Sequence, residues 1–481
     1  MTHCLYNFIK MNDIRFYLDL FNTTVPELEK TTATALRRGG DYADLYFEYT
    51  SYYNLILKDG AVTSGGFHTD YGVGIRVLKG EKTGYAYSEN LEPAEMLKAA
   101  DAASAIASCE GDGRVYSKVE DRRPDFYPMT NDWRNSEAST FLPFLTALEQ
   151  EITAKDSRIV KVIARLAYSV SDIMMYNSLG ELTVDTRPMG SLSVSIVFHQ
   201  NGKTENKSVS RSFRIGSEFI CPALAAEIAE EAVKGIDERF EARRPKGGQM
   251  SVVMGAGASG ILLHEAMGHA FEADFNRKGQ SIFSDKLGKQ VCPKGVNVVD
   301  DGTVFSNRGA VNYDDEGVPG QKTYMVEDGV LKSYLHDRIS AAWYGVAPTG
   351  NGRRESFRYN PIPRMRATYM ESGSADPQGM IASVKNGVYV DEFSNGQVKI
   401  GEGDFTFFVK SGFLIEDGRL TMPVKDINII GNGPQALADI VAVGNDLKID
   451  NGTWTCGKEQ SVAVSCGMPT VLISNLTVGG E

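Results

Sequence analysis

The chain has 481 residues, of which 42% are hydrophobic and 23% are charged, a composition typical of a water-soluble protein with two or three domains. Its 50 basic and 62 acidic side chains give a formal charge of -12, which argues against nucleic acid or an anionic membrane as a partner. The start of the chain lacks a secretory signal, no apolar run is long enough to cross a membrane, and the six scattered cysteines do not form a disulfide framework. We therefore expect a cytoplasmic protein.

The first half of the chain predicts an α+β domain, in which helices back an antiparallel sheet. An amphipathic helix is expected over 11–38 with an interruption near Pro26, and further helices are expected over 93–108, 141–154 and 222–243. Alternating apolar residues between turn residues predict strands over 43–49, 53–58, 71–78, 83–88, 160–170, 172–177, 182–187 and 191–200.

The segment Arg243–Gly248 ends a helix and combines charge with proline and glycine, so we predict two domains, over 1–245 and 246–481. Downstream, short alternating segments predict hairpins that turn at Asp328–Gly329 and Asp417–Gly418, and a helix is expected over 433–443. The second domain should be a β-rich barrel or sandwich, with the helix around residue 264 laid across it.

The stretch 250–274 carries the strongest chemical signal. It predicts a strand over 250–254, a glycine turn over 255–260 and a helix that bears His264, Glu265 and His269. Two imidazoles beside a carboxylate can hold Zn²⁺ and deprotonate a water bound to it. Because the chain has only six histidines, two of them beside a glutamate favour a metal site over a chance match.

The two histidines are five residues apart, whereas the familiar zinc-peptidase motif spaces them by four. In a regular α-helix a five-residue step turns the second side chain about 140° away from the first, against about 40° for a four-residue step. We therefore predict a local irregularity between Ala266 and His269, either a π-type bulge or a break at Gly268.

Two other functions stay open at this point. Gly255–Gly260 satisfies the dinucleotide-binding pattern G-x-G-x-x-G, but no strand that ends in an acidic residue follows at the required spacing of about 20 positions. The histidines could instead hold a structural metal in a non-catalytic partner or scaffold protein, and a filled fourth coordination position would indicate that role.

A catalytic zinc needs a third protein ligand. The downstream glutamate that many zinc peptidases use is missing, since no glutamate occurs over 273–315. Thiolates suit zinc, so Cys456, Cys466 and Cys292 are the candidates. Lys458, two residues after Cys456, would favour a thiolate there.

Together these residues resemble the TldD/PmbA family of peptidases over almost the whole chain. The resemblance is carried by four stretches: His264–His269, Asp314–Pro319, Cys456–Lys458 and Asn475–Gly480. Because the TldE/PmbA branch of the family lacks the H-E-x-x-x-H motif, the chain is more similar to the TldD, catalytic branch.

The resemblance implies a zinc-dependent peptidase in which His264, His269 and Cys456 bind the metal and Glu265 is the general base. It also implies a homodimer, or a heterodimer with a TldE/PmbA-like subunit, that encloses a chamber and cleaves unfolded or small peptides. Independently of the resemblance, the glycine-rich loop 349–356 carries Arg353 and Arg354, which we expect to bind a substrate carbonyl or carboxylate.

Overall fold

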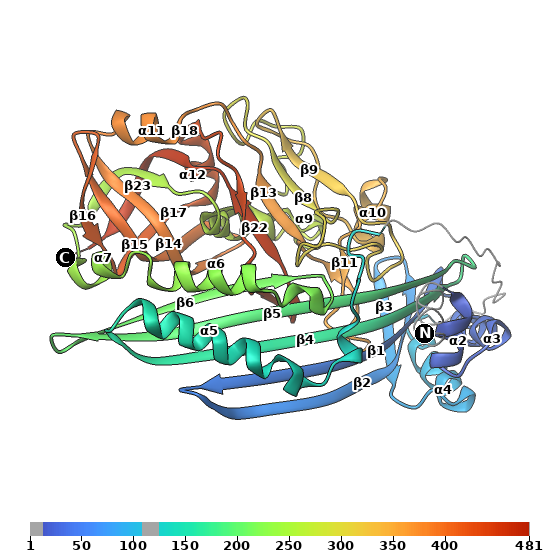
Figure 1. Ribbon diagram of the computed structural model, residues 1–481. Helices are drawn as coiled ribbons and strands as arrows, with labels where there is room; N and C mark the ends of the chain where they lie inside the picture. Colours follow the sequence, from blue (N-terminus) through green and yellow to red (C-terminus); the bar gives the residue numbers. More distant parts are fainter. Residues whose placement is uncertain (1–12, 108–124, 481) are drawn as a thin grey trace.

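The computed structural model describes residues 13–107 and 125–480 (Figure 1). The predicted helix start at 11–12, the predicted helix end at 108 and two of the six cysteines lie outside these residues. In the described part of the chain no helix is both long and apolar enough to span a membrane.

The first half of the chain forms a six-stranded antiparallel sheet in the order β3-β2-β1-β4-β5-β6. Its strands are β1 (Tyr42–Lys58), β2 (Ala61–Lys79), β3 (Lys82–Ser88), β4 (Ile159–Asn177), β5 (Leu182–Gln200) and β6 (Lys203–Phe213). The accompanying helices are α2 (Ile14–Leu20), α3 (Val25–Leu36), α4 (Pro93–Ser104), α5 (Leu142–Lys155), α6 (Pro222–Val233) and α7 (Ile236–Glu241). The predicted α+β class of this half is confirmed.

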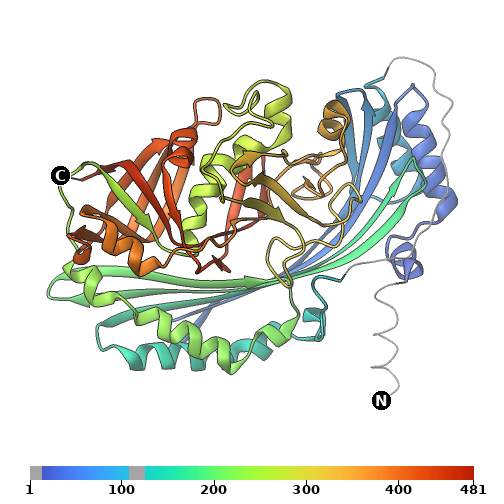
Figure 2. The same cartoon turned by 90° about the horizontal axis from the view of Figure 1, so that it is seen from above.

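The two faces of this sheet are buried against different parts of the molecule. On β4, Leu166 and Met174 belong to apolar cores that include the helices. Ile173 and Met175 point to the opposite face, as side chains alternate along a strand, and pack with Phe357 of the second half. Figure 2 shows the sheet curving around the second half with the helices on its outer side.

The strands are longer than the sequence pattern predicts. β1 continues through Thr50 and Ser51, which lie in the predicted gap but are buried, and β4 continues through Ser171. β5 likewise continues through Gly190, where a Cβ atom would lie 2.7 Å from the ring of Trp133. The predicted breaks are wrong because these small or polar residues are covered by other parts of the fold.

Two predicted helices end earlier than expected. The helix predicted over 222–243 is split into α6 and α7 at Gly235, which has a φ of 72°. The helix predicted over 433–443 ends as α12 (Gly433–Ala438), and the β-branched residues that follow form β18 (Ile440–Val443), which pairs with β23 (Val471–Gly479). The predicted interruption near Pro26 is confirmed, since α3 begins at Val25.

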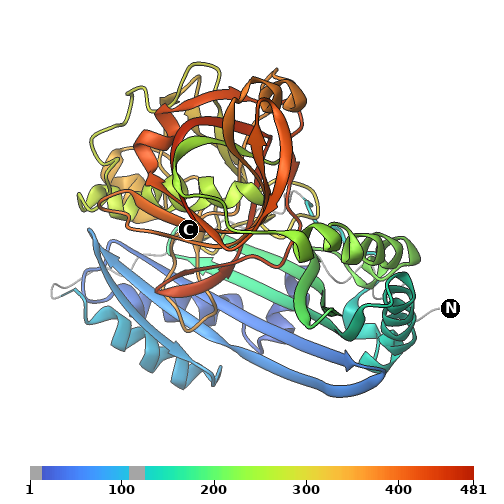
Figure 3. The ribbon, with the colours of Figure 1, turned by 90° about the vertical axis from the view of Figure 1, so that its left-hand side faces the viewer.

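The second half contains a five-stranded barrel, which confirms the β-rich prediction. Its strands are β7 (Gly248–Met254), β14 (Asn386–Val398), β15 (Asp404–Glu416), β17 (Ile427–Asn432) and β23, and the ring closes because β14 pairs with both β7 and β15. β16 (Arg419–Val424) extends β15 after the predicted turn at Asp417–Gly418. Figure 3 shows these strands standing above the N-terminal sheet.

A second sheet lies beside the barrel, in the order β10-β9-β8-β13-β22-β19. It comprises β8 (Val298–Asp301), β9 (Lys322–Glu327), β10 (Val330–Leu331), β13 (Ala367–Met370), β19 (Lys448–Ile449) and β22 (Ser465–Met468). The hairpin predicted at Asp328–Gly329 joins β9 to β10. The remaining elements are α10 (Arg338–Tyr344), α11 (Pro377–Ser383), β11 (Gly352–Arg353), β12 (Ile362–Pro363), β20 (Thr455–Lys458) and β21 (Gln460–Ala463).

Buried ion pairs join the two halves at the Asp314–Pro319 stretch. Arg187 of β5 donates to Asp315 at 2.6 Å, and Arg76 of β2 donates to Glu316 at 2.6 Å. The domain boundary between residues 245 and 246 falls in the segment between α7 and β7 and stays a prediction.

Candidate metal centre

The motif helix has the irregular geometry that the histidine spacing requires. After β7 the chain enters α8 (Ile261–Leu263) and then a π-helical turn over His264–Gly268. The backbone N–H of His269 donates to the carbonyl of His264, which is the i+5 to i bond of π geometry. This bond brings residues five apart to the same side, and the two imidazole centroids lie 5.1 Å apart. The irregularity predicted between Ala266 and His269 is confirmed.

Two glycines let the motif helix pack closely against its neighbours. A Cβ atom on Gly268 would lie 2.1 Å from Sδ of Met365, and one on Gly260 would lie 2.5 Å from the backbone nitrogen of Gly467 on β22. The close approach of backbone at Gly260 can be made only without a side chain. Close packing therefore explains why residue 260, the last position of the G-x-G-x-x-G match, is a glycine, and no bound dinucleotide phosphate is needed to explain it.

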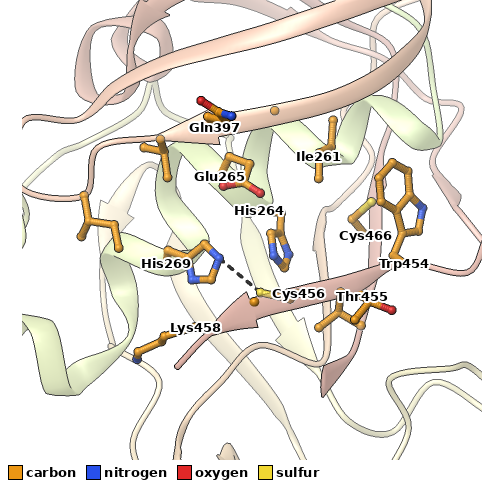
Figure 4. A pocket seen from close by; sticks show the side chains of 15 residues that line it. Ile261, His264, Glu265, His269, Gln397, Trp454, Thr455, Cys456, Lys458 and Cys466 are labelled. Carbon is orange, nitrogen blue, oxygen red and sulfur yellow. Dashed lines mark hydrogen bonds between the residues drawn. The ribbon is translucent and has the colours of Figure 1, made fainter. Parts of the chain in front are cut away.

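The structure gathers His264, His269 and Cys456 into one buried group. Their potential ligand atoms all lie within 4.8 Å of one another, and the side chains are only 3%, 6% and 5% exposed. Sγ of Cys456, on β20, is 3.2 Å from Nε2 of His269 (Figure 4). Within the described ranges no other group of three His, Cys, Asp or Glu side chains could hold a metal ion.

The other two candidate cysteines are not part of this group. Cys466 is buried on β22 and lines the same cavity, yet it is not among the three clustered residues, and burial raises the pKa of its thiol. Cys292 lies in the apolar core of the second half, where burial raises its pKa to about 12. Cys456 is therefore the cysteine that the fold brings to the two imidazoles.

Glu265 faces a cavity of about 510 Å³ beside the group (Figure 4). Burial raises the pKa of Glu265, and the neighbouring His264 and His269 partly offset this effect. A raised pKa brings a carboxylate closer to the range in which it can take up a proton and release it again near neutral pH. The lining comes from the motif helix, β14 and the β20–β22 region: Ile261, His264, Glu265, His269, Gly396, Gln397, Val398, Ile400, Trp454, Thr455, Cys456, Gly457, Lys458, Val464 and Cys466.

A buried network of charged side chains contacts His269 on the side of the imidazole that faces away from Cys456. Nδ1 of His269 donates to Glu272 at 3.0 Å, which leaves Nε2 towards Cys456. Glu272 is fully buried and lies 3.1 Å from Nζ of Lys458 and 3.6 Å from Nε of Arg364. Arg364 also donates to the carbonyl of Cys456 at 2.7 Å, so the network reaches both elements of the group. Such outer contacts fix the orientation of a metal-binding imidazole.

The pKa shifts reflect this arrangement. Burial alone would raise the pKa of Cys456, but the nearby His264 and His269 lower it to about 4. Burial opposes the ionisation of Glu272 too, yet Lys458 and His269 lower its pKa to about 2. The two imidazoles are the largest causes of the lowered pKa of Cys456, and Nζ of Lys458 contacts Glu272 and Asp274. A contribution of Lys458 to the thiolate stays a prediction.

Sequence reasoning missed Glu272 and Arg364. Glu272 follows His269 by three residues, a spacing that lets two side chains meet on one helical face and could have identified it. Arg364 is distant from every motif in the sequence, so no local signal indicates its role.

Arg353 and Arg354 do not line the metal-centre cavity. Both are buried and line a separate cavity of about 290 Å³. Arg353 donates to the carbonyls of Met365 and Ala463, and Arg354 donates to the carbonyl of Asp315. Their binding to substrate stays a prediction.

The donor set of the group fits zinc. Two imidazole nitrogens and a thiolate are ligands that Zn²⁺ prefers, and three protein ligands leave one position open for catalysis. Nδ1 of His264 is buried and has no hydrogen-bond partner in the described part of the chain. Buried polar atoms are normally paired, so a polar atom of the group is left unsatisfied by the protein.

Known proteins match the chain over nearly its full length. Models of the PmbA/TldA metallopeptidases match in three parts: domain 1 over 43–107, the central domain over 131–236 and the C-terminal domain over 247–480. A metalloprotease TldD homolog of Haemophilus influenzae is 39% identical, over 92% of this chain and 94% of that protein. A zinc metalloprotease TldD homolog of Saccharolobus solfataricus is 27% identical, over 92% and 97%.

A solved structure shares the fold. TldE from Thermococcus kodakarensis superposes with a TM-score of 0.73 at 17% identity, covering 94% of this chain and 100% of that chain. The fold, the buried group and the relatives together define a metalloprotease. The chain belongs to the PmbA/TldD family, and its relatives place it on the TldD side. This assignment confirms the resemblance and is at odds with the dinucleotide-binding alternative.

Proposed function

We propose that the protein is a zinc-dependent peptidase, in which His264, His269 and Cys456 bind the metal and Glu265 is the general base. The main support is that the potential ligand atoms of these three side chains lie within 4.8 Å of one another, beside a cavity that Glu265 lines. Bound zinc would polarise the scissile carbonyl and lower the pKa of a water molecule.

The residues of the chain supply proton transfer and orientation. The carboxylate of Glu265 accepts a proton from water and then delivers it to the nitrogen of the leaving amine. Its raised pKa suits both steps, because the group must hold the proton between them. Glu272 keeps the ring of His269 in one orientation through its hydrogen bond to Nδ1.

The proposed substrates are unfolded or small peptides. A cavity of about 510 Å³ admits a short stretch of extended chain and is too small for a folded domain. We further propose that the protein acts as a homodimer or as a heterodimer with a TldE/PmbA-like subunit, which the shared fold with a TldE structure supports.

Paired variants test the two roles. Glu265→Gln should keep bound zinc and lose hydrolysis of an unstructured peptide by a factor of at least about 100, because it cannot accept the proton. Cys456→Ser should lose zinc as well as activity, measured by elemental analysis of the purified protein beside a peptide-cleavage assay. Cys466→Ser is the matched control, because this thiol lines the same cavity outside the ligand group and should leave the zinc content unchanged.

Full activity of Glu265→Gln would reject this residue as the base. If Cys456→Ser keeps its zinc and Cys466→Ser loses it, Cys466 and not Cys456 is the third ligand. The alternative of a structural metal in a non-catalytic protein predicts a closed fourth position. In the described residues no fourth His, Cys, Asp or Glu joins the group, which favours the catalytic role.

A further inference from the structure

A second cavity, of about 290 Å³, lies between the N-terminal sheet and the second half, and we call it the arginine cavity. Four arginines contribute to its lining: Arg214, Arg308, Arg353 and Arg366. Within residues 13–107 and 125–480, no carboxylate oxygen lies within 4.0 Å of any of these four guanidinium groups. The cavity reaches the surface, since Glu355 and Ser461 in its lining are exposed.

The four guanidinium groups use neutral partners, and two of the four leave a buried donor unused. Arg308 donates to the hydroxyl of Ser212 at 2.7 Å, and Arg366 donates through Nε to the carbonyl of Gly350 at 2.7 Å. Nη2 of Arg366 and Nε of Arg214 are buried and have no hydrogen-bond partner among the described residues. Arg214 and Arg366 are only 9% and 3% exposed, so water does not easily supply the missing contacts.

The acidic residues of the lining are engaged elsewhere. Asp315 accepts from Arg187 at 2.6 Å and from the backbone N–H of Arg354 at 2.8 Å. Glu355 accepts from the backbone N–H of Ser461 at 2.6 Å. Glu48 accepts from the backbone of Phe357, and burial raises its pKa to about 7, which reduces its negative charge near neutral pH.

Burial lowers the pKa of all four arginines, by the cost of holding a cation away from water. Arginine nevertheless remains protonated in proteins. Carboxylates farther away, such as Asp315 near Arg366 and Arg353, offset part of this cost. The fold therefore keeps several positive charges around one small cavity without a direct ion pair among the described residues, an arrangement that an anion would stabilise. The planar guanidinium fork matches carboxylate and phosphate oxygens in particular.

The arginine cavity adjoins the hairpin that carries Cys456. Val462, opposite Cys456 in the β20–β21 pairing, lines the arginine cavity, whereas Cys456 lines the metal-centre cavity (Figure 4). Arg308 donates to the carbonyl of Trp454 at 3.0 Å, and Arg353 donates to that of Ala463 at 2.7 Å. These contacts connect two of the arginines to both strands of the hairpin at its open end.

We propose that the arginine cavity is a binding site for one small oxyanion, a carboxylate or phosphate group, held by the four guanidinium groups. The oxyanion is either a free ion or the C-terminal carboxylate of a peptide. Its binding stabilises the hairpin that presents Cys456. The site is separate from the metal centre, so anion binding there can be tested without relying on peptidase activity.

The first test uses inorganic phosphate and the purified full-length protein. Calorimetric titration should show saturable binding, and saturating phosphate should raise Tm by about 2 °C or more relative to sodium chloride at matched ionic strength and pH. Arg214→Gln should weaken phosphate binding by about 10-fold or more, since a charge-assisted hydrogen-bond donor is lost. In chloride alone its Tm should not fall by more than about 2 °C, because repulsion among the arginines is relieved.

Arg419→Gln is the matched control, because Arg419 is exposed on β16 outside the cavity lining and should bind phosphate like the wild type. Arg214→Lys keeps the charge but loses the fork, and it should show an intermediate affinity. The titration of wild-type protein remains decisive even where a variant fails to fold.

A short peptide with a free C-terminus and the same peptide as its amide distinguish the two sources of the oxyanion. Binding of the acid alone, with displacement by phosphate, identifies a peptide terminus, whereas phosphate binding that neither peptide affects identifies a free ion. Absence of binding by both phosphate and the acid peptide overturns the proposal. Equal phosphate affinity of wild type and Arg214→Gln overturns it too, because the ion would then be held elsewhere.

Discussion

The β20–β21 hairpin separates two clusters of buried charge that are organised in opposite ways. On the metal side, Glu272 is matched by His269, Lys458 and Arg364 within 3.6 Å. On the other side, the four arginines of the arginine cavity have no ion pair among the described residues. In the first cluster the charges are paired within the protein. In the second, the proposed anion would supply the negative charge that pairs with the arginines.

The two clusters contribute differently to stability and to binding. A buried ion pair adds little net stability, since desolvation offsets much of the attraction, but removing one partner is costly. The paired cluster therefore fixes the positions of His269 and Cys456, whereas the arginines remain available for a ligand. Breaking one charge on each side should have opposite consequences.

The largest effect is expected from Glu272→Gln. The variant leaves Lys458 and Arg364 without their shared carboxylate, so the free energy of unfolding should fall by about 3–5 kcal/mol. The ring of His269 loses its charged partner, so zinc affinity should fall by about 10–100-fold. Denaturant unfolding and competition with a zinc chelator measure the two changes.

Glu459→Gln is the control for this change, because Glu459 is exposed in the turn of the same hairpin. It should alter neither quantity appreciably. Wild-type zinc affinity in Glu272→Gln would mean that the network behind His269 does not position the imidazole.

A smaller, pH-dependent effect is expected on the arginine side, at Glu48. Burial raises its pKa from 4.5 to about 7. The native state therefore retains a proton that the unfolded chain releases, and the contribution of Glu48 to stability is lost as pH rises from 4.5 through about 7. One pKa unit corresponds to about 1.4 kcal/mol, so this loss amounts to at most about 3.5 kcal/mol.

Glu48→Gln should remove this part of the pH dependence. The stability difference between variant and wild type, measured by denaturant unfolding at several pH values, should shift in favour of the variant across that range. A constant offset would reflect only the changed contact with the N–H of Phe357. A difference that moves in the opposite direction would show that the native pKa is not raised.

The sequence predicted which residues come together near His264 more accurately than it predicted the lengths of the strands. His264, Glu265 and His269 lie in one local motif, and the five-residue spacing of the histidines predicted a local irregularity, either a π-type bulge or a break at Gly268. The structure contains the π-helical turn. Cys456 lies far along the chain, and the residues left it as one of three candidates until the family resemblance selected it. The structure brings Cys456 to the histidines by a tertiary contact between segments 187 residues apart in the chain, which no local pattern reveals.

The errors share one physical cause. Thr50, Ser51 and Gly190 were expected to end strands, because such residues favour turns where one face of a strand meets water. In this fold both faces of the sheet are covered. Thr50 lies on the face that packs against the second half, whereas Gly190 packs against Trp133 on the face that carries the helices, so residues of this kind are buried within β1 and β5. Arg364 was missed for a related reason, since its side-chain partners, Glu272 and the carbonyls of Cys456 and Gln460, come from two parts of the chain that are distant from it in sequence.

The smallest effect tests how strictly the π-helical turn sets the geometry of the paired side. In Gly268→Ala the new methyl group would lie 2.1 Å from Sδ of Met365, which is fully buried, so either the methionine or the turn must move. Overpacking of this kind costs about 1–3 kcal/mol, and the flexible methionine favours the lower end. A shift of the turn would also separate His269 from Cys456 and lower zinc affinity.

Gly457→Ala is the matched control for Gly268→Ala. Gly457 lies beside Cys456 on β20, and an added Cβ atom would meet nothing within 4 Å, so its stability should stay within about 0.5 kcal/mol of the wild type. If Gly268→Ala loses stability but binds zinc like Gly457→Ala, Met365 has yielded and the turn has kept its shape. If zinc affinity falls together with stability, the turn has moved. The position of the imidazoles then requires glycine at residue 268.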